Sequence, residues 1–179
     1  MVGLMVLGQP GFAAVNNVAG LNNPLGNVGV SARAVGMGST FVGIADDSSA
    51  LFWNPAGLGT LKCDQVALHH NSWLAGIVQE TAVLALPTQD WGGFGFSGNV
   101  VNYGAMDGYD ANGVRLANYS ANRYGFGLGW GRELVSGLAA GVAVKGSTQT
   151  IAGESYSGFS ADLGALWSPT TDFKLGAAF

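Results

Sequence analysis

The feature that most constrains the fold is a strict alternation of large apolar residues with glycine in the segment 119–132. Tyr124, Phe126, Leu128 and Trp130 are each separated from the next by a single glycine. Successive side chains of a β-strand point to opposite faces, whereas a helix repeats every 3.6 residues. The segment is therefore predicted to be a strand with one large apolar face and one nearly bare face.

The same two-residue period runs through the chain from residue 64 onward and predicts an all-β fold of seven strands. The predicted strands are 64–73, 76–86, 92–103, 119–132, 138–147, 157–168 and 172–179. Short connections at 87–91, 133–137 and 168–171 alternate with longer or more polar ones at 104–118 and 148–156. Short turns at one end and long loops at the other are typical of an outer-membrane barrel. Trp91, Trp130 and Trp167 would form an aromatic girdle at the short-turn end.

Composition narrows the class of protein further. Charged residues make up 10% of the chain, against about 25% in a typical soluble domain, and 30 residues are glycine. A soluble β-sandwich would also alternate, but its water-facing side normally carries Lys, Glu and Thr rather than Gly, Ala and Ser. A membrane-spanning helix needs about 20 apolar residues, and beyond the N-terminus the chain has no such run. The scarcity of charged residues also argues against a nucleic-acid binder, which would be basic, and the net charge of −4 is too small to say more about partners. These observations favour an antiparallel transmembrane β-barrel with small residues in a crowded interior.

Three regions are predicted along the chain. Residues 1–14 are interpreted as a signal-peptide remnant, because an apolar stretch precedes small residues at 11–14; a buried first strand is the alternative. Residues 15–62 are expected to form an N-terminal hatch, or plug, of short helices and loops, with a helix over 45–53 that ends at Asn54 and Pro55. Residues 63–179 are expected to be a partial barrel truncated at its C-terminus. Closed single-chain barrels have an even number of strands, and an eight-stranded one has no room for a plug.

Motifs for catalysis or cofactor binding are weak in this sequence. The glycines of 93–98 match a dinucleotide fingerprint, but a strand follows them where a helix is required. His69 and His70 are adjacent on a predicted strand and so point to opposite faces, and Cys63 is the single cysteine. No G-x-S-x-G elbow is present. We therefore expect no enzymatic activity, no cofactor and no metal.

Four charged residues are predicted on the faces that point away from lipid in four successive strands: Arg123, Lys145, Asp162 and Lys174. Charges that line a barrel interior can select solutes. Alternatively, these side chains pair with one another or with carboxylates of the hatch, such as Asp46 and Asp47. Both interpretations stay open at the level of sequence.

The segment 32–58 resembles the N-terminal region of the PorV/PorQ family, within the FadL-like superfamily of outer-membrane barrels. Three elements match in order and spacing, and 72–77 and 162–167 are also similar. The matching residues are Gly36, Met37 and Gly38; Ala45, Asp46 and Asp47; and Asn54, Pro55, Ala56 and Gly57. The resemblance implies a barrel of about 14 strands with an N-terminal hatch, of which roughly seven strands are present here. It also implies that Pro55 is a fixed turn near the barrel floor.

The resemblance further implies a non-enzymatic protein of the Gram-negative outer membrane. PorV-like members serve type IX secretion and hold secreted cargo at that membrane, so a role in secretion or surface-protein assembly is expected. FadL-like members pass hydrophobic molecules, so uptake of fatty acids or aromatic hydrocarbons is the alternative. The implied partners are outer-membrane lipid and either secreted cargo proteins or hydrophobic small molecules.

Overall fold

The protein folds into one antiparallel sheet of seven strands in sequence order. The computed structural model describes residues 29–170 and 172–179, so the predicted signal-peptide remnant 1–14 and residues 15–28 of the predicted hatch lie outside the described residues. The strands are β1 (Gln65–Ser72), β2 (Val78–Thr88), β3 (Gly92–Met106), β4 (Tyr119–Val135), β5 (Leu138–Ile151), β6 (Glu154–Thr170) and β7 (Phe173–Ala178). Each pairs with the next, and all pairings are antiparallel.

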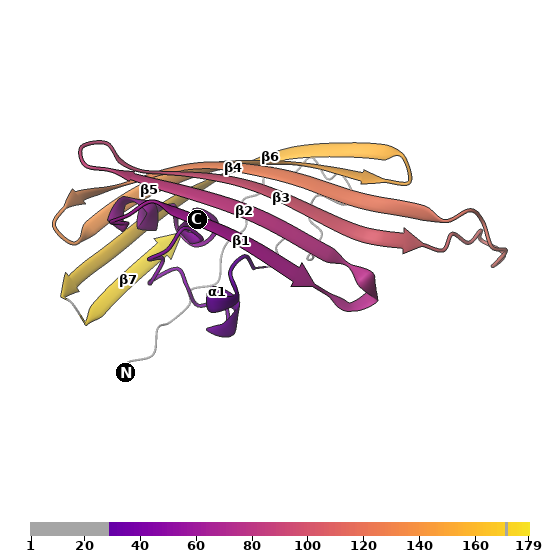
Figure 1. The fold of residues 1–179 in the computed structure, drawn as a ribbon, viewed down its shortest axis with the longest axis horizontal. Helices are drawn as coiled ribbons and strands as arrows, with labels where there is room; N and C mark the ends of the chain where they lie inside the picture. The colour runs from indigo at the N-terminus through magenta and orange to yellow at the C-terminus, as the bar shows by residue number, and fades with distance from the viewer. Residues whose placement is uncertain (1–28, 171) are drawn as a thin grey trace.

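The sheet curls into a half-barrel, and the N-terminal elements lie on its concave side (Figure 1). These elements are the helices α1 (Ala32–Gly36) and α2 (Ala50–Trp53) and the 3₁₀ helix η2 (Pro55–Thr60); a further 3₁₀ turn, η3 (Leu74–Gly76), links β1 to β2. Among the described residues, no helix is both long and apolar enough to cross a membrane. The prediction of an all-β fold with seven antiparallel strands is confirmed.

The connection predicted over 148–156 is wrong, because β5 and β6 continue through it. Only Ala152 and Gly153 separate the two strands, and both have positive φ (50° and 91°), as a two-residue type I′ hairpin requires. The polar residues around this turn extend the strand pairing instead of forming a loop. Thr148 and Ser157 share a hydroxyl hydrogen bond of 2.9 Å, and so do Thr150 and Ser155. The alternation of short and long connections therefore holds in part, and the link between β3 and β4 is the long one.

The strand register divides the sheet into two chemically different faces. On β4 the outer face carries Tyr124, Phe126, Leu128 and Trp130, and the cross-strand partners of Leu128 continue that face as Phe96 on β3 and Val144 on β5. Many large apolar side chains of this face are exposed: Val66, Leu68, Phe94, Phe96, Val100, Tyr124, Phe126, Leu128, Val142, Val144, Phe159, Leu163 and Trp167. The half-barrel thus presents an apolar convex surface, while its concave face holds the buried core.

The apolar surface has a defined height. On β6 the outward residues run from Phe159 to Trp167, eight residue steps or about 26 Å along the strand. Phe126 and Phe159 meet edge to face above Gly146, with ring centroids 6.2 Å apart, and cover the bare backbone there. Toward the hairpin of β5 and β6 the same face turns polar, with Thr148, Thr150, Ser155 and Ser157. At the opposite end the indole nitrogen of Trp130 donates a hydrogen bond of 2.7 Å to the Trp91 carbonyl.

The helix predicted over 45–53 forms only over its last turn, as α2. Asp47 prevents an earlier start, because its carboxylate accepts hydrogen bonds from the backbone N–H and the hydroxyl of Ser49 (2.9 and 2.5 Å). The helix ends where the sequence predicts, since Asn54 precedes a proline and has extended backbone angles.

Candidate functional site: the hatch and the inner face

The hatch, here its described residues 29–62, rests directly on glycines of the inner face. A Cβ atom placed on Gly131 or Gly141 would overlap the main chain of Pro55, and one placed on Gly164 would overlap the Asn54 amide. These three glycines lie on β4, β5 and β6 and are cross-strand neighbours in one row. Together with Gly93 on β3, whose Cβ would overlap the Leu58 carbonyl, they form the hatch seat. The bare strand face seen in the sequence is therefore the surface on which the hatch backbone lies.

Asn54 ties the hatch to the wall and to itself. Its side chain is fully buried. The amide nitrogen donates to the carbonyl of Val42 within the hatch and to that of Ala165 on β6, both at 2.9 Å. The amide oxygen accepts from the N–H of Ala56 at 3.1 Å and caps η2. One side chain thus binds three backbone groups, two of the hatch and one of β6.

Above the seat, leucines of the hatch fill the space left by the next glycines. Leu51 and Leu58 are fully buried, and both contact the place where a Cβ on Gly129 would stand. They share a core cluster with Phe41 of the hatch and with wall residues Val83, Ala85 and Ala143. The main hydrophobic core of the described chain is therefore the interface between hatch and wall.

The other residues of the resemblance motif shape the hatch itself. Gly36 ends α1, Gly38 has a φ of 68°, and Met37 packs against the core while its carbonyl accepts a 2.6 Å hydrogen bond from the Thr40 hydroxyl. A Cβ on Gly57 would overlap the carbonyl oxygen of Ala45. Gly57 therefore allows close backbone contact within the hatch, and Pro55 and Ala56 are buried against the wall.

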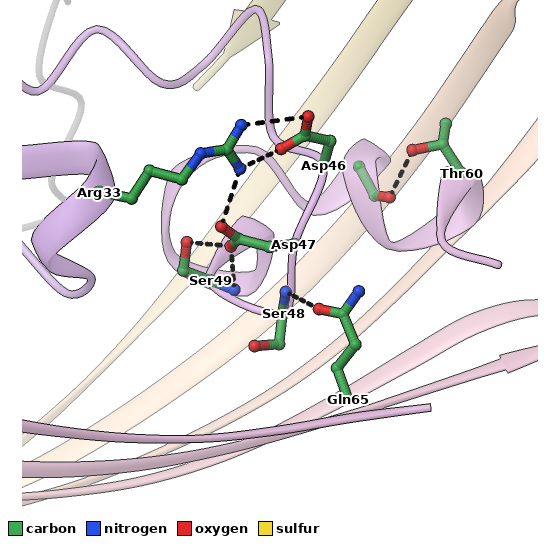
Figure 2. Close-up of polar contacts among 8 residues, drawn as sticks. Arg33, Asp46, Asp47, Ser48, Ser49, Thr60 and Gln65 are labelled. Atoms are coloured by element: carbon green, nitrogen blue, oxygen red, sulfur yellow. Dashed lines mark hydrogen bonds and ion pairs between the residues drawn. The ribbon is translucent and has the colours of Figure 1, made fainter. Parts of the chain in front are cut away.

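A cluster of charged side chains joins α1 to the acidic residues Asp46 and Asp47 of the hatch (Figure 2). The Arg33 guanidinium, from α1, contacts both Asp46 oxygens (2.5 and 3.3 Å) and one Asp47 oxygen (3.2 Å). It also lies over the Phe41 ring at 5.2 Å from the centroid. The hydrogen bond from Arg33 lowers the pKa of Asp46 below its usual value, with a smaller contribution from the charge of Lys174 on β7, and the same bond raises the pKa of Arg33. The acidic loop is thus held between α1 and the wall.

A second polar contact joins this loop to β1. The backbone N–H of Ser48 donates to the Gln65 amide oxygen at 2.7 Å, as Figure 2 shows. The structure therefore anchors the hatch at both edges of the half-barrel, through Gln65 on β1 and through the main chain at Val42, which lies against Gly176 on β7.

The four predicted inner-face charges do not behave as one group. Lys145 and Asp162 form an ion pair. The Lys145 ammonium also donates to the Phe52 carbonyl at 3.4 Å and lies 5.5 Å from the centre of the Phe52 ring, so the pair holds the end of α2. The positive charge of Lys174 contributes to lowering the pKa of Asp46 in the hatch. Arg123 differs from Lys145 and Asp162, because among the described residues it forms no ion pair. Its guanidinium donates a 3.3 Å hydrogen bond to the Ser147 hydroxyl. Pairing therefore accounts for Lys145 and Asp162, and Asp46 and Asp47 pair with Arg33.

Sequence reasoning missed the roles of Arg33, Gln65 and the Asn54 side chain. Arg33 carried no signal beyond being the first cation of the chain, and Gln65 looked like an ordinary strand residue. The sequence identifies Asn54 as a helix stop and as part of the hatch motif, but it assigns no role to the side chain. The available signal was the glycine row, which shows that something must lie against the wall but not which side chains hold it.

The remaining candidates from the sequence are metal-ligating side chains and the two histidines. Across 29–170 and 172–179, no three or more His, Cys, Asp or Glu residues are grouped so as to hold a metal ion. His69 and His70 point to opposite faces as predicted, and the Nδ1 atom of His70 lies 2.6 Å from a Glu80 oxygen on the outer surface.

Comparison with known proteins places most of the chain in one family. Residues 27–171 match the model of an uncharacterised protein family, UPF0164. The comparison with curated proteins gives no match.

Proposed function

The chain belongs to the uncharacterised protein family UPF0164, and we propose that its seven strands form part of the wall of a closed β-barrel in the outer membrane of a Gram-negative bacterium. One observation carries this proposal. The convex face of the sheet is apolar over Phe159–Trp167 on β6, a stretch of nine residues, and a transmembrane strand needs about 9–11.

The distribution of other side chains supports the same location. Trp91, Trp130 and Trp167 gather at the end with the short turns, and hydroxyl residues such as Thr148 and Ser157 occupy the outer face at the other end. An apolar band with aromatic residues at its boundary is what a bilayer requires of a barrel. On a water-facing sheet, so many exposed large apolar side chains would favour aggregation.

We propose further that the protein is not an enzyme and that it serves type IX secretion or the assembly of surface proteins. The closely seated hatch favours this role over conduction. Its main chain lies on glycines of four strands, and Asn54 and Lys145 bind it to β6 and β5. A plug held in this way suits a platform that presents cargo without opening a pore.

The second candidate is passage of hydrophobic compounds such as fatty acids or aromatic hydrocarbons. An apolar cluster on the inner face favours it, formed by Val101, Tyr103 and Ala121 with Ile77, Met106 and Ile151 packed against them. A hydrophobic compound inside the barrel would bind to these apolar side chains on the wall.

Two experiments test these proposals, one for the location and one for the role. Cell fractionation tests the location: the protein should stay with outer membranes after carbonate washing, and release into the soluble fraction would refute the barrel proposal. Proteoliposomes test the role: entry of a fluorescent fatty acid at the rate of empty liposomes supports the platform. Faster entry that disappears when a disulfide joins hatch to wall supports passage.

A further inference from the structure

Four buried polar atoms of the inner face lack a hydrogen-bond partner. In the part of the chain that the structure describes, these atoms are His69 Nε2, Tyr103 OH, Arg123 Nη1 and Gln149 Oε1. They come from β1, β3, β4 and β5, and those of Arg123 and Gln149 belong to adjacent strands. Buried polar groups are normally satisfied, so these exceptions call for an explanation.

The register brings two of these groups together. Arg123 on β4 is the direct cross-strand partner of Gln149 on β5, and on its other side it pairs with Val101 on β3, which in turn pairs with Gln79 on β2. Gln149 and Gln79 are 3% and 4% exposed. The next row toward the hatch holds four polar side chains, those of His69, Thr81, Asn99 and Ser147, and Gly125. Arg123 thus lies at the boundary between this polar row and the apolar cluster that contains Val101.

The environment of Arg123 lacks a counter-charge. A guanidinium is protonated at all relevant pH values and only donates hydrogen bonds. Its described partner is the neutral Ser147 hydroxyl, while Lys145 takes up Asp162. Glu154 is one row further on the same face, exposed at the hairpin tip, and no ion pair within the described residues joins it to Arg123.

Apolar neighbours make this charge more costly. Val101 belongs to the cluster with Tyr103 and Ala121 that covers the inner face beyond the Arg123 row. A cation beside apolar side chains loses hydration, and only an anion with matched hydrogen bonds restores the loss. Arg123 is partly buried, and its Nη1 atom is fully covered without a hydrogen-bond partner among the described residues, so an anion bound on the inner face would satisfy a donor that is otherwise unpaired.

We propose that Arg123 and Gln149 form the centre of a binding site for an oxyanion, a carboxylate or a phosphate group, on the inner face above the hatch. Arg123 Nη1 donates to the oxyanion, and the Gln149 side-chain amide and the Tyr103 hydroxyl donate further hydrogen bonds once they reorient. This inference concerns the inner face and holds whether or not the outer face lies in a membrane.

The first test measures binding to the full chain purified in a zwitterionic detergent. Thermal unfolding is followed at constant ionic strength with sodium phosphate, sodium acetate or sodium chloride. Phosphate, acetate or both should raise the unfolding temperature above that in chloride, and the stronger of the two identifies the oxyanion class. Equal unfolding temperatures in all three salts would overturn the proposal.

Two variants assign the site. Arg123→Gln should weaken oxyanion binding about tenfold or more, because a charge-assisted hydrogen bond is lost. The control is Arg115→Gln, since Arg115 is an exposed loop residue whose guanidinium is paired with Asp107. Equal weakening in both variants would show non-specific charge binding and refute the assignment.

Gln149→Glu gives the most specific result and does not depend on how Arg123→Gln folds. The new carboxylate lies directly across from Arg123 and supplies the missing counter-charge. This variant should unfold at a higher temperature than the parent protein in chloride and should no longer respond to phosphate or acetate. A lower unfolding temperature with the oxyanion response intact would contradict the proposal.

Discussion

The substitution Gly141→Ala tests most sharply whether the hatch rests on the wall through bare backbone. A Cβ on Gly141 would overlap the carbonyl carbon and oxygen of Pro55 and the N–H of Ala56. All three atoms are main chain, so no side-chain rotation relieves the overlap, and either η2 or β5 must move. Overpacking of this kind costs about 1–3 kcal/mol.

The matched control is Gly98→Ala on β3, where nothing lies within 4 Å of the added Cβ. Replacing a glycine without strain reduces the freedom of the unfolded chain and stabilises by about 0.4–1 kcal/mol. The two variants make the same chemical change within strands of the same sheet. They should therefore differ in sign, with a gap of about 1.4–4 kcal/mol in the free energy of unfolding.

Urea unfolding in detergent micelles, followed by tryptophan fluorescence, measures this gap, because Trp53 of the hatch packs against Phe41. Limited trypsin digestion gives a second reading. Arg33 is held by Asp46 and Asp47, so cleavage after it should accelerate in Gly141→Ala and not in Gly98→Ala. Equal stability and equal cleavage in the two variants would refute the seating of the hatch on the glycine row.

Three further predictions follow from the contacts of the hatch. Asn54→Ala should destabilise the protein by about 2–4 kcal/mol in urea unfolding, because three hydrogen bonds are lost in a fully buried site; a loss under ~0.5 kcal/mol would contradict the bridging role. Asp162→Asn should leave Lys145 without its counter-ion and speed proteolysis of the hatch, whereas unchanged digestion would mean that the ion pair does not hold α2. Because Arg33 lowers the pKa of Asp46 in the folded state, the pair stabilises above the unfolded pKa of about 3.9 and loses that contribution as pH falls through the lower folded pKa. Both groups are well exposed, so the contribution should be under about 1 kcal/mol, and it should vanish in Arg33→Gln when stability is compared between pH 5 and pH 2.5.

The wall could be predicted from sequence because each strand carries its own evidence. The period of two in Tyr124–Trp130 fixes both the strand and its outer face without reference to any distant residue. The error over 148–156 arose because Thr148, Thr150, Ser155 and Ser157 look like loop residues along the chain. They are strand residues because they face each other across the β5–β6 pair, and cross-strand contacts are invisible in a linear reading.

The hatch could be foreseen only in outline. The glycines at 131, 141 and 164 indicated a crowded interior, yet the Asn54 bond to Ala165 and the Ser48 bond to Gln65 join residues set by tertiary packing alone. The start of α2 also depended on a local competition, in which the Asp47 carboxylate captures Ser49. The alternation along each strand suffices to name the inner-face charges as a set of candidates, but the different surroundings of Arg123 and Lys145 become visible only when the register is known.

The central claim is that the convex face of the half-barrel meets lipid while the concave face does not. A nitroxide scan along β6 tests it directly, with the native Cys63 replaced by serine and single cysteines placed in turn from Phe159 to Trp167 in protein reconstituted into liposomes. The account predicts a period of two: labels at 159, 161, 163, 165 and 167 should be accessible to oxygen and shielded from a water-soluble nickel reagent, and labels at 160, 162 and 164 should not share that exposure to oxygen. Nickel accessibility at every outward position would contradict the account, because the convex face would then lie in water.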